Sequence, residues 1–86
     1  MNWRIIVMKE RIREIIFEYF GDMFPEKRLE FNENFVEYGF NSYTLVELLI
    51  QVEETFCVEL NDEFLLAENI NTVEKLENAI NSSNKG

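Results

Sequence analysis

The centre of the chain reads Glu37-Tyr38-Gly39-Phe40-Asn41-Ser42-Tyr43-Thr44-Leu45-Val46-Glu47-Leu48-Leu49. Ser42 follows a glycine that allows a sharp bend, and it precedes an apolar run with helical spacing. The first N–H groups of a helix lack partners within the helix and carry the positive end of its dipole. A phosphate ester on Ser42 would be stabilised there, so Ser42 is the candidate attachment site.

The helix expected over residues 42–56 has two apolar stripes. Its core stripe consists of Leu45, Leu48, Leu49, Val52 and Phe56. A second stripe on nearly the opposite side consists of Tyr43, Val46 and Ile50, and it is bordered by Glu47, Glu53 and Glu54. Because a helix of a small domain rarely buries both faces, we expect these six residues to form an exposed partner-binding surface. The alternative is that they are scattered surface side chains.

The remaining chain predicts three further helices. Residues 2–20 form an amphipathic helix whose core face is Ile5, Met8, Ile12, Ile15, Ile16 and Tyr19. Residues 21–41 form a long loop that Phe24, Leu29, Phe31, Phe35 and Val36 pack against the domain. A short third helix follows at residues 62–68, and Thr72 caps a last helix to about Asn81, with Val73, Leu76, Ala79 and Ile80 buried. The prediction is a small all-α four-helix bundle in which residues 1–86 are one domain, ordered from about 3 to 81, with a flexible tail at 82–86.

The charge of the chain restricts its partners. Eight Lys and Arg stand against 17 Asp and Glu, for a formal net charge of −9. Such a charge disfavours nucleic acid and anionic membranes and favours basic protein surfaces. Residues 41–70 hold seven acidic side chains and no basic one, so the acidity surrounds Ser42. The apolar run at residues 5–8 is too short to cross a membrane, and we expect a monomeric cytoplasmic protein.

Several kinds of chemistry are excluded by the residue types present. Cys57 is the only cysteine and there is no histidine, so an internal disulfide, a zinc cluster or a Ser-His nucleophile cannot form. We expect Cys57 to be a small core or boundary residue. The cluster Asn61-Asp62-Glu63 lacks the ligand pattern of a calcium loop. An enzyme that uses Glu53 and Glu54 is a weak alternative, because adjacent helical side chains point about 100° apart.

The stretch from Phe35 to Ile80 resembles the acyl and peptidyl carrier proteins. These have a glycine, an apolar residue, an acidic residue and the modified serine before an acidic amphipathic helix, and here the chain reads Gly39-Phe40-Asn41-Ser42-Tyr43. The downstream segments Val58-Glu59-Leu60-Asn61-Asp62 and Ile70-Asn71-Thr72-Val73 also resemble the family. Asn41 departs from its usual Asp, and Tyr43 departs from its usual Leu or Met.

The resemblance implies a non-catalytic carrier. Ser42 would carry 4′-phosphopantetheine from coenzyme A, with Asn41 and Tyr43 beside it, and its thiol would hold acyl, aminoacyl or peptidyl groups as thioesters. The implied partners are a phosphopantetheinyl transferase, a loading ligase and later biosynthetic enzymes. The length and the unusual Asn41-Ser42-Tyr43 favour natural-product biosynthesis over fatty-acid synthesis, which is the alternative. An unmodified protein-interaction module is a further alternative.

Overall fold

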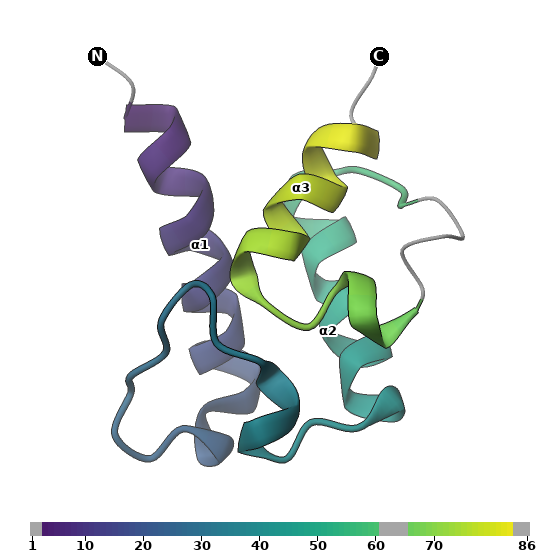
Figure 1. The fold of residues 1–86 in the computed structure, drawn as a ribbon. Coiled ribbons are helices and arrows are strands. Elements are labelled where there is room, and N and C mark those ends of the chain that lie inside the picture. Colours follow the sequence, from purple (N-terminus) through teal and green to yellow (C-terminus); the bar gives the residue numbers. More distant parts are fainter. Residues whose placement is uncertain (1–2, 61–65, 84–86) are drawn as a thin grey trace.

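The fold is all-helical over residues 3–60 and 66–83, which the computed structural model describes, with side chains described from Met8 to Leu60 and from Leu66 to Ser82. Three α-helices, α1 (Trp3–Phe20), α2 (Ser42–Phe56) and α3 (Val73–Ser83), lie within these ranges. Three 3-10 helices, η1 (Gly21–Met23), η2 (Phe35–Tyr38) and η4 (Ala67–Asn69), lie in the connections. α1 packs against both α2 and α3, and the loop from α1 to α2 crosses the lower end of the molecule (Figure 1).

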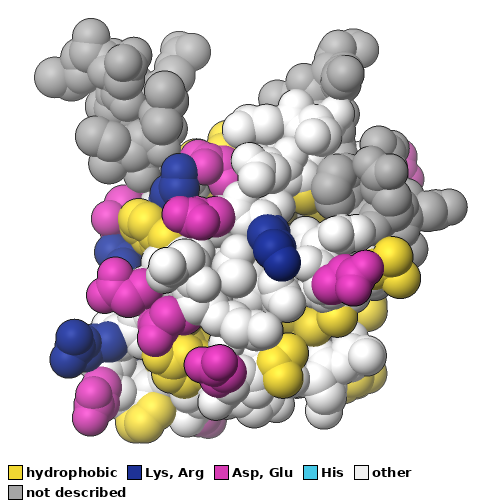
Figure 2. Space-filling view, viewed as in Figure 1, with side chains coloured by type: hydrophobic (Ala, Val, Ile, Leu, Met, Phe, Trp, Pro, Cys, Tyr) yellow, Lys and Arg dark blue, Asp and Glu magenta, His cyan; other side chains and the backbone are white. Residues whose placement is uncertain are grey.

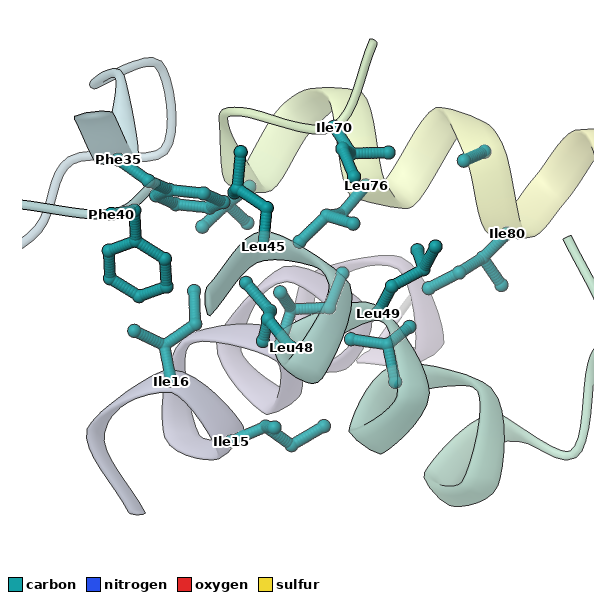
Figure 3. Packing of buried hydrophobic residues seen from close by; sticks show 14 of the residues in the cluster. Ile15, Ile16, Phe35, Phe40, Leu45, Leu48, Leu49, Ile70, Leu76 and Ile80 are labelled. Atoms are coloured by element: carbon teal, nitrogen blue, oxygen red, sulfur yellow. The ribbon is translucent and has the colours of Figure 1, made fainter. Parts of the chain in front are cut away.

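One hydrophobic core joins the three α-helices and the long loop. Most residues of the apolar stripes expected in the helices meet in this core together with loop residues, and Figure 3 labels ten of the buried side chains. The buried members are Ile12, Ile15, Ile16, Phe24, Leu29, Phe35, Phe40, Leu45, Leu48, Leu49, Val52, Leu60, Ile70, Val73, Leu76, Ala79 and Ile80. Ile15 and Ile80 are each 1% exposed, so both are core residues. The side chain of Ile5, expected on the core face of the first helix, lies outside the described side chains.

The C-terminal helix begins as its sequence predicts. Thr72 accepts the N–H of Lys75 on its Oγ1 at 3.0 Å, so Thr72 is the N-cap. All four residues of the expected stripe are buried: Val73, Leu76, Ala79 and Ile80. The helix continues to Ser83, two residues beyond the expected end at Asn81. Of the expected flexible tail, residues 84–86 lie outside the described residues.

The four-helix count is not confirmed. Most of the helix expected over residues 62–68 falls on residues 61–65, outside the described residues. In the part that is described, Leu66 is exposed and Ala67–Asn69 form the 3-10 helix η4.

The long loop is packed down, as expected, and its backbone is also tied to the helices. Phe24, Leu29 and Phe35 are buried, and Phe31 packs against them. Phe35 N donates to Asn71 O at 2.8 Å, Glu74 N donates to Phe31 O at 3.1 Å, and Arg13 Nη1 donates to Leu29 O at 3.1 Å. These bonds join the loop to α1 and to the start of α3, so the loop is part of the domain's scaffold.

Two residues expected in the core are exposed. Val36 lies in η2, where three residues make one turn, so Phe35 and Tyr38 share the inward side and Val36 points outward. Tyr19 has the angular position of a core residue, but it lies near the C-terminal end of α1. There it lines an open cavity of about 700 Å³ together with Phe20 and Met23. Periodicity predicts the direction of a side chain but not whether another element covers it.

The basic side chains of α1 that the structure describes, Lys9, Arg11 and Arg13, are paired with acidic ones. Arg11 and Arg13 contact Glu14 and Glu10 at 3.1 and 2.8 Å, and Figure 2 shows charges of both signs mixed over one face of the molecule. The two i,i+3 pairs neutralise part of the basic charge of α1. Among the helices of the described ranges, none is long and apolar enough to span a membrane.

Candidate functional site

Hydrogen bonds hold η2, the 3-10 helix that leads toward Ser42. Asn34 caps it by accepting the N–H of Val36 on its side chain at 2.8 Å. The Tyr38 hydroxyl donates to Glu33 Oε1 at 3.0 Å. This hydrogen bond, with burial and the negative charges of Glu33 and Glu37, raises the pKa of Tyr38 above its ordinary value. The segment before the site therefore has a defined conformation.

Gly39 ends η2 and turns the chain toward α2. Its φ is 104°, in the left-handed region that glycine adopts most readily, and its N–H donates to Val36 O at 3.1 Å. A Cβ at this position would lie 3.2 Å from the Met23 methyl carbon. The left-handed conformation therefore explains the glycine three residues before Ser42, and the Met23 methyl group would have to shift slightly for any larger residue.

The start of α2 is closed by a reciprocal capping box. Asn41 is the N-cap, and its Oδ1 accepts the N–H of Thr44 at 3.0 Å. Thr44 Oγ1 in turn accepts the N–H of Asn41 at 2.7 Å. The neutral amide at position 41 thus makes the hydrogen bond that an N-cap requires, and it adds no charge beside Ser42.

Ser42 is the first residue of α2, and its side chain is exposed. Within the described part of the chain its hydroxyl makes no hydrogen bond. The N–H of Thr44 donates to Asn41 Oδ1 in the capping box, and Leu45 N donates to Asn41 O at 2.9 Å. The N–H groups of Ser42 and Tyr43 are those that a helix start leaves without an intrahelical acceptor.

These features suit a phosphodiester on Ser42. Two backbone donors lie on the same turn as the hydroxyl, at the positive end of the helix dipole. The first turn contains no acidic side chain, so a new negative charge meets no carboxylate there. The residues present therefore fit the attachment of a phosphate-linked group.

The second stripe of α2 is exposed, as its sequence predicts. Tyr43 is 71% exposed, Val46 43% and Ile50 45%. Glu54 is also exposed and Glu47 is half-buried, so carboxylates border the apolar strip. We call Tyr43, Val46 and Ile50 the outward strip. It begins at the residue next to Ser42, so a protein bound to it would lie beside the serine.

Glu53 differs from the other carboxylates of the expected partner-binding surface. Its Oε2 accepts the N–H of Leu60 at 2.8 Å, so it holds the segment that follows α2 against the helix. Leu60 is buried in the core. This hydrogen bond gives Glu53 a structural role that the helical pattern could not reveal, because Leu60 lies beyond the end of the helix.

Cys57 is exposed, whereas a core or boundary position was expected. It ends α2 in the left-handed conformation with φ of 56°, and its N–H donates to Glu53 O. At 100° per residue, position 57 lies about 120° around the helix from Leu45, so it falls outside the core stripe of α2. Among the described residues, no cluster of His, Cys, Asp or Glu could hold a metal ion.

Sequence reasoning missed two residues of the site. Phe40 is buried and contacts three other aromatic rings, although its position in a glycine turn gave no periodic signal. Thr44 completes the capping box. Its three-residue separation from Asn41 is the spacing of that motif, but Thr replaces the usual Glu or Gln.

Comparisons with known proteins identify the family of the chain. The sequence model of the family described as "Phosphopantetheine attachment site" matches residues 10–80. The chain is 39% identical over 77 residues to an "Acyl carrier protein" of Buchnera aphidicola subsp. Acyrthosiphon pisum (strain 5A), which covers 90% of this chain and 92% of the relative. It is 41% identical over 68 residues to the "Acyl carrier protein" of strain Tuc7, covering 79% of this chain and 81% of the relative.

The chain belongs to the phosphopantetheine-binding carrier family. Its prosthetic group is 4′-phosphopantetheine. Family membership also implies a phosphopantetheinyl transferase and biosynthetic enzymes as partners.

Proposed function

We propose that Ser42 carries the prosthetic group and that the chain is an acyl carrier protein of the fatty-acid-synthesis type. The observation that carries the attachment is the exposed Ser42 hydroxyl at the first position of a helix whose neutral first turn leaves two N–H groups open. When bound, the group supplies a terminal thiol that holds an acyl chain as a thioester.

Each residue around Ser42 has a proposed role. Gly39 turns the chain so that the serine faces solvent, and Asn41 and Thr44 hold the first turn of α2 in its helical conformation. The N–H groups of Ser42 and Tyr43 stabilise the phosphate charge. The protein needs no catalytic residue for this function, because the partner enzymes make and break the bonds of the cargo.

The cargo is proposed from the relatives. Both have the printed name "Acyl carrier protein", which supports an acyl cargo over an aminoacyl or peptidyl one. They also favour the fatty-acid alternative over the natural-product pathway that the unusual Asn41-Ser42-Tyr43 suggested. Neither the family model nor the relatives support antibiotic biosynthesis. The cytoplasmic location and the monomeric state stay predictions.

Docking is proposed to use the outward strip and the carboxylates that border it. Tyr43, Val46 and Ile50 provide apolar contact area, and Glu47 and Glu54 attract a basic enzyme surface. Glu53 lies on the same helix but is engaged by Leu60 N, so we propose that it contributes mainly through the field of its charge.

The attachment is tested by intact-mass spectrometry after incubation with coenzyme A and a broad-specificity phosphopantetheinyl transferase. The wild-type chain should gain the mass of one arm, Ser42→Ala should gain none, and the control Ser82→Ala should gain one arm. No mass gain on the wild type would favour the unmodified interaction module, and modification of Ser42→Ala would place the site elsewhere.

The cargo class is tested on the modified protein. A malonyl transferase of fatty-acid synthesis and an amino-acid-adenylating enzyme of peptide synthesis would each be offered the modified chain and its Ser42→Ala variant. Loading by the first enzyme is expected. Loading by the second enzyme alone would refute the fatty-acid assignment and leave the attachment site intact.

A further inference from the structure

Phe40 is the buried residue that connects the site to the core. It lies between Gly39 and Asn41, two positions before Ser42, and it is only 2% exposed. Asn41, Ser42 and Tyr43 are all exposed, and Thr44 is half-buried. The next fully buried side chain on the helix is Leu45. The first turn of α2 is therefore attached to the core through Phe40 before it and Leu45 after it.

Three aromatic rings surround the Phe40 ring, and each comes from a different segment. The ring centroid of Phe40 lies 5.1 Å from Phe20 at the end of α1, 5.9 Å from Phe24 in the loop and 5.5 Å from Phe35 in η2. Figure 3 shows Phe40 beside Phe35 at one end of the core. Such tilted ring pairs are favourable beyond the area they bury. Three elements thus determine where the ring lies.

Phe40 itself makes only a weak backbone hydrogen bond. Its N–H donates to Phe35 O at 3.4 Å, which is long for this kind of bond. Its neighbours are held more firmly, because Gly39 N donates to Val36 O at 3.1 Å and Asn41 N donates to Thr44 Oγ1 at 2.7 Å. Of the three residues that separate η2 from α2, only Phe40 is buried, so its ring anchors this connection to the core where α2 begins.

We propose that Phe40 is a positioning residue for modification of Ser42. By fixing the start of α2, it keeps the capping box closed and holds the Ser42 hydroxyl and the two open N–H groups in one arrangement. This inference rests on the proposed attachment at Ser42. The inference adds that efficient modification of Ser42 depends on a buried aromatic side chain, Phe40, that the transferase does not contact.

The variants are Phe40→Ala, Phe40→Leu and a control, Ile80→Ala, which removes a side chain of α3 that is equally buried. The transferase kcat and the KM for the carrier are measured at a temperature at which circular dichroism shows every variant to be folded. Small misplacements of reacting groups can lower a reaction rate by up to about 100-fold. We therefore expect kcat for Phe40→Ala to fall about tenfold or more. KM should change little, since the outward strip is intact, and Phe40→Leu should recover part of the loss.

Amide hydrogen exchange gives a second readout with a control inside the same molecule. The starts of α2 and α3 have matching bonds: Thr44 N and Leu45 N donate to Asn41, and Lys75 N and Leu76 N donate to Thr72. In Phe40→Ala and Phe40→Leu, exchange should accelerate at the start of α2 relative to the start of α3. If Phe40→Ala does not fold, Phe40→Leu is compared with Ile80→Val by the same two measurements.

The outcomes separate this inference from the proposed function. A kcat for the Phe40 variants equal to that of the Ile80 control, a rise in KM alone, or unchanged exchange at Thr44 and Leu45 would overturn the positioning role. A wild-type chain that is not modified at Ser42 would instead overturn the proposed function, whatever the exchange data show.

Discussion

The two faces of α2 should respond differently to substitution. Leu49 is 2% exposed, and truncating a buried leucine costs about 2–5 kcal/mol of unfolding free energy, so Leu49→Ala should be strongly destabilising. Val46 and Ile50 are 43% and 45% exposed. Complete burial of such a side chain contributes about 1.5–3 kcal/mol to the free energy of unfolding, and a little over half of the surface of each of these two residues is buried. Glutamine keeps part of this area and favours helix, so Val46→Gln and Ile50→Gln should each cost about 1 kcal/mol or less.

Urea unfolding followed by circular dichroism measures these differences as shifts of the midpoint at constant m-value. The same variants, carrying the prosthetic group, are then assayed for transfer of the acyl group to a partner enzyme. Val46→Gln and Ile50→Gln should raise KM for the carrier. If they destabilise the domain as much as Leu49→Ala does, the outward strip is part of the core and cannot be a docking surface. Unchanged KM in stable variants would also refute the docking role.

Three further predictions concern charged and titratable groups. Because the pKa of Tyr38 is raised in the folded state, its contribution to stability is complete below the unfolded-state pKa of about 10 and is lost as pH rises through the folded-state pKa. Urea unfolding across this range should therefore show a smaller loss of stability in Tyr38→Phe than in wild type. Glu77→Gln breaks the part-buried pair with Lys9, whose Nζ–Oε1 distance is 2.6 Å. This substitution should lower the free energy of unfolding by about 1–3 kcal/mol, between the values for exposed and fully buried pairs. Glu14→Gln, which breaks an exposed pair, should lower it by about 1 kcal/mol or less. Equal losses in the two variants would contradict a larger contribution from the part-buried pair. Asn41→Asp should preserve the cap and the unfolding midpoint and speed modification by a generic transferase, and an unchanged rate would show that the neutral residue is no obstacle.

Local patterns predicted much of the fold and the centre of the site. The bounds of α2, the Thr72 cap of α3 and the exposed face of α2 depend on interactions within one turn or one helix face. Such interactions repeat with the helical period, so they can be recognised in a single sequence. The same locality places Ser42 at a helix start.

Contacts outside the helical pattern explain what the sequence did not predict. Glu53 accepts the N–H of Leu60, which lies beyond the end of α2, and this bond gives a residue of the expected docking surface a structural role as well. Tyr19 has the periodicity of a core residue but lines an open cavity, because the extent of the neighbouring elements determines what is covered. The exposure of Cys57 has a local cause, because position 57 falls outside the core stripe of α2.

The sequence by itself determined that this is a small acidic helical domain with a serine at the start of an amphipathic helix. Composition and helical period depend on residue types and short spacings alone. Only the tertiary structure showed how that serine is held. The ring of Phe40 meets Phe20 and Phe24, and Glu74 N of α3 donates to Phe31 O of the loop, so these contacts join residues far apart in the chain. No spacing encodes these contacts, because they form only when the whole core is assembled.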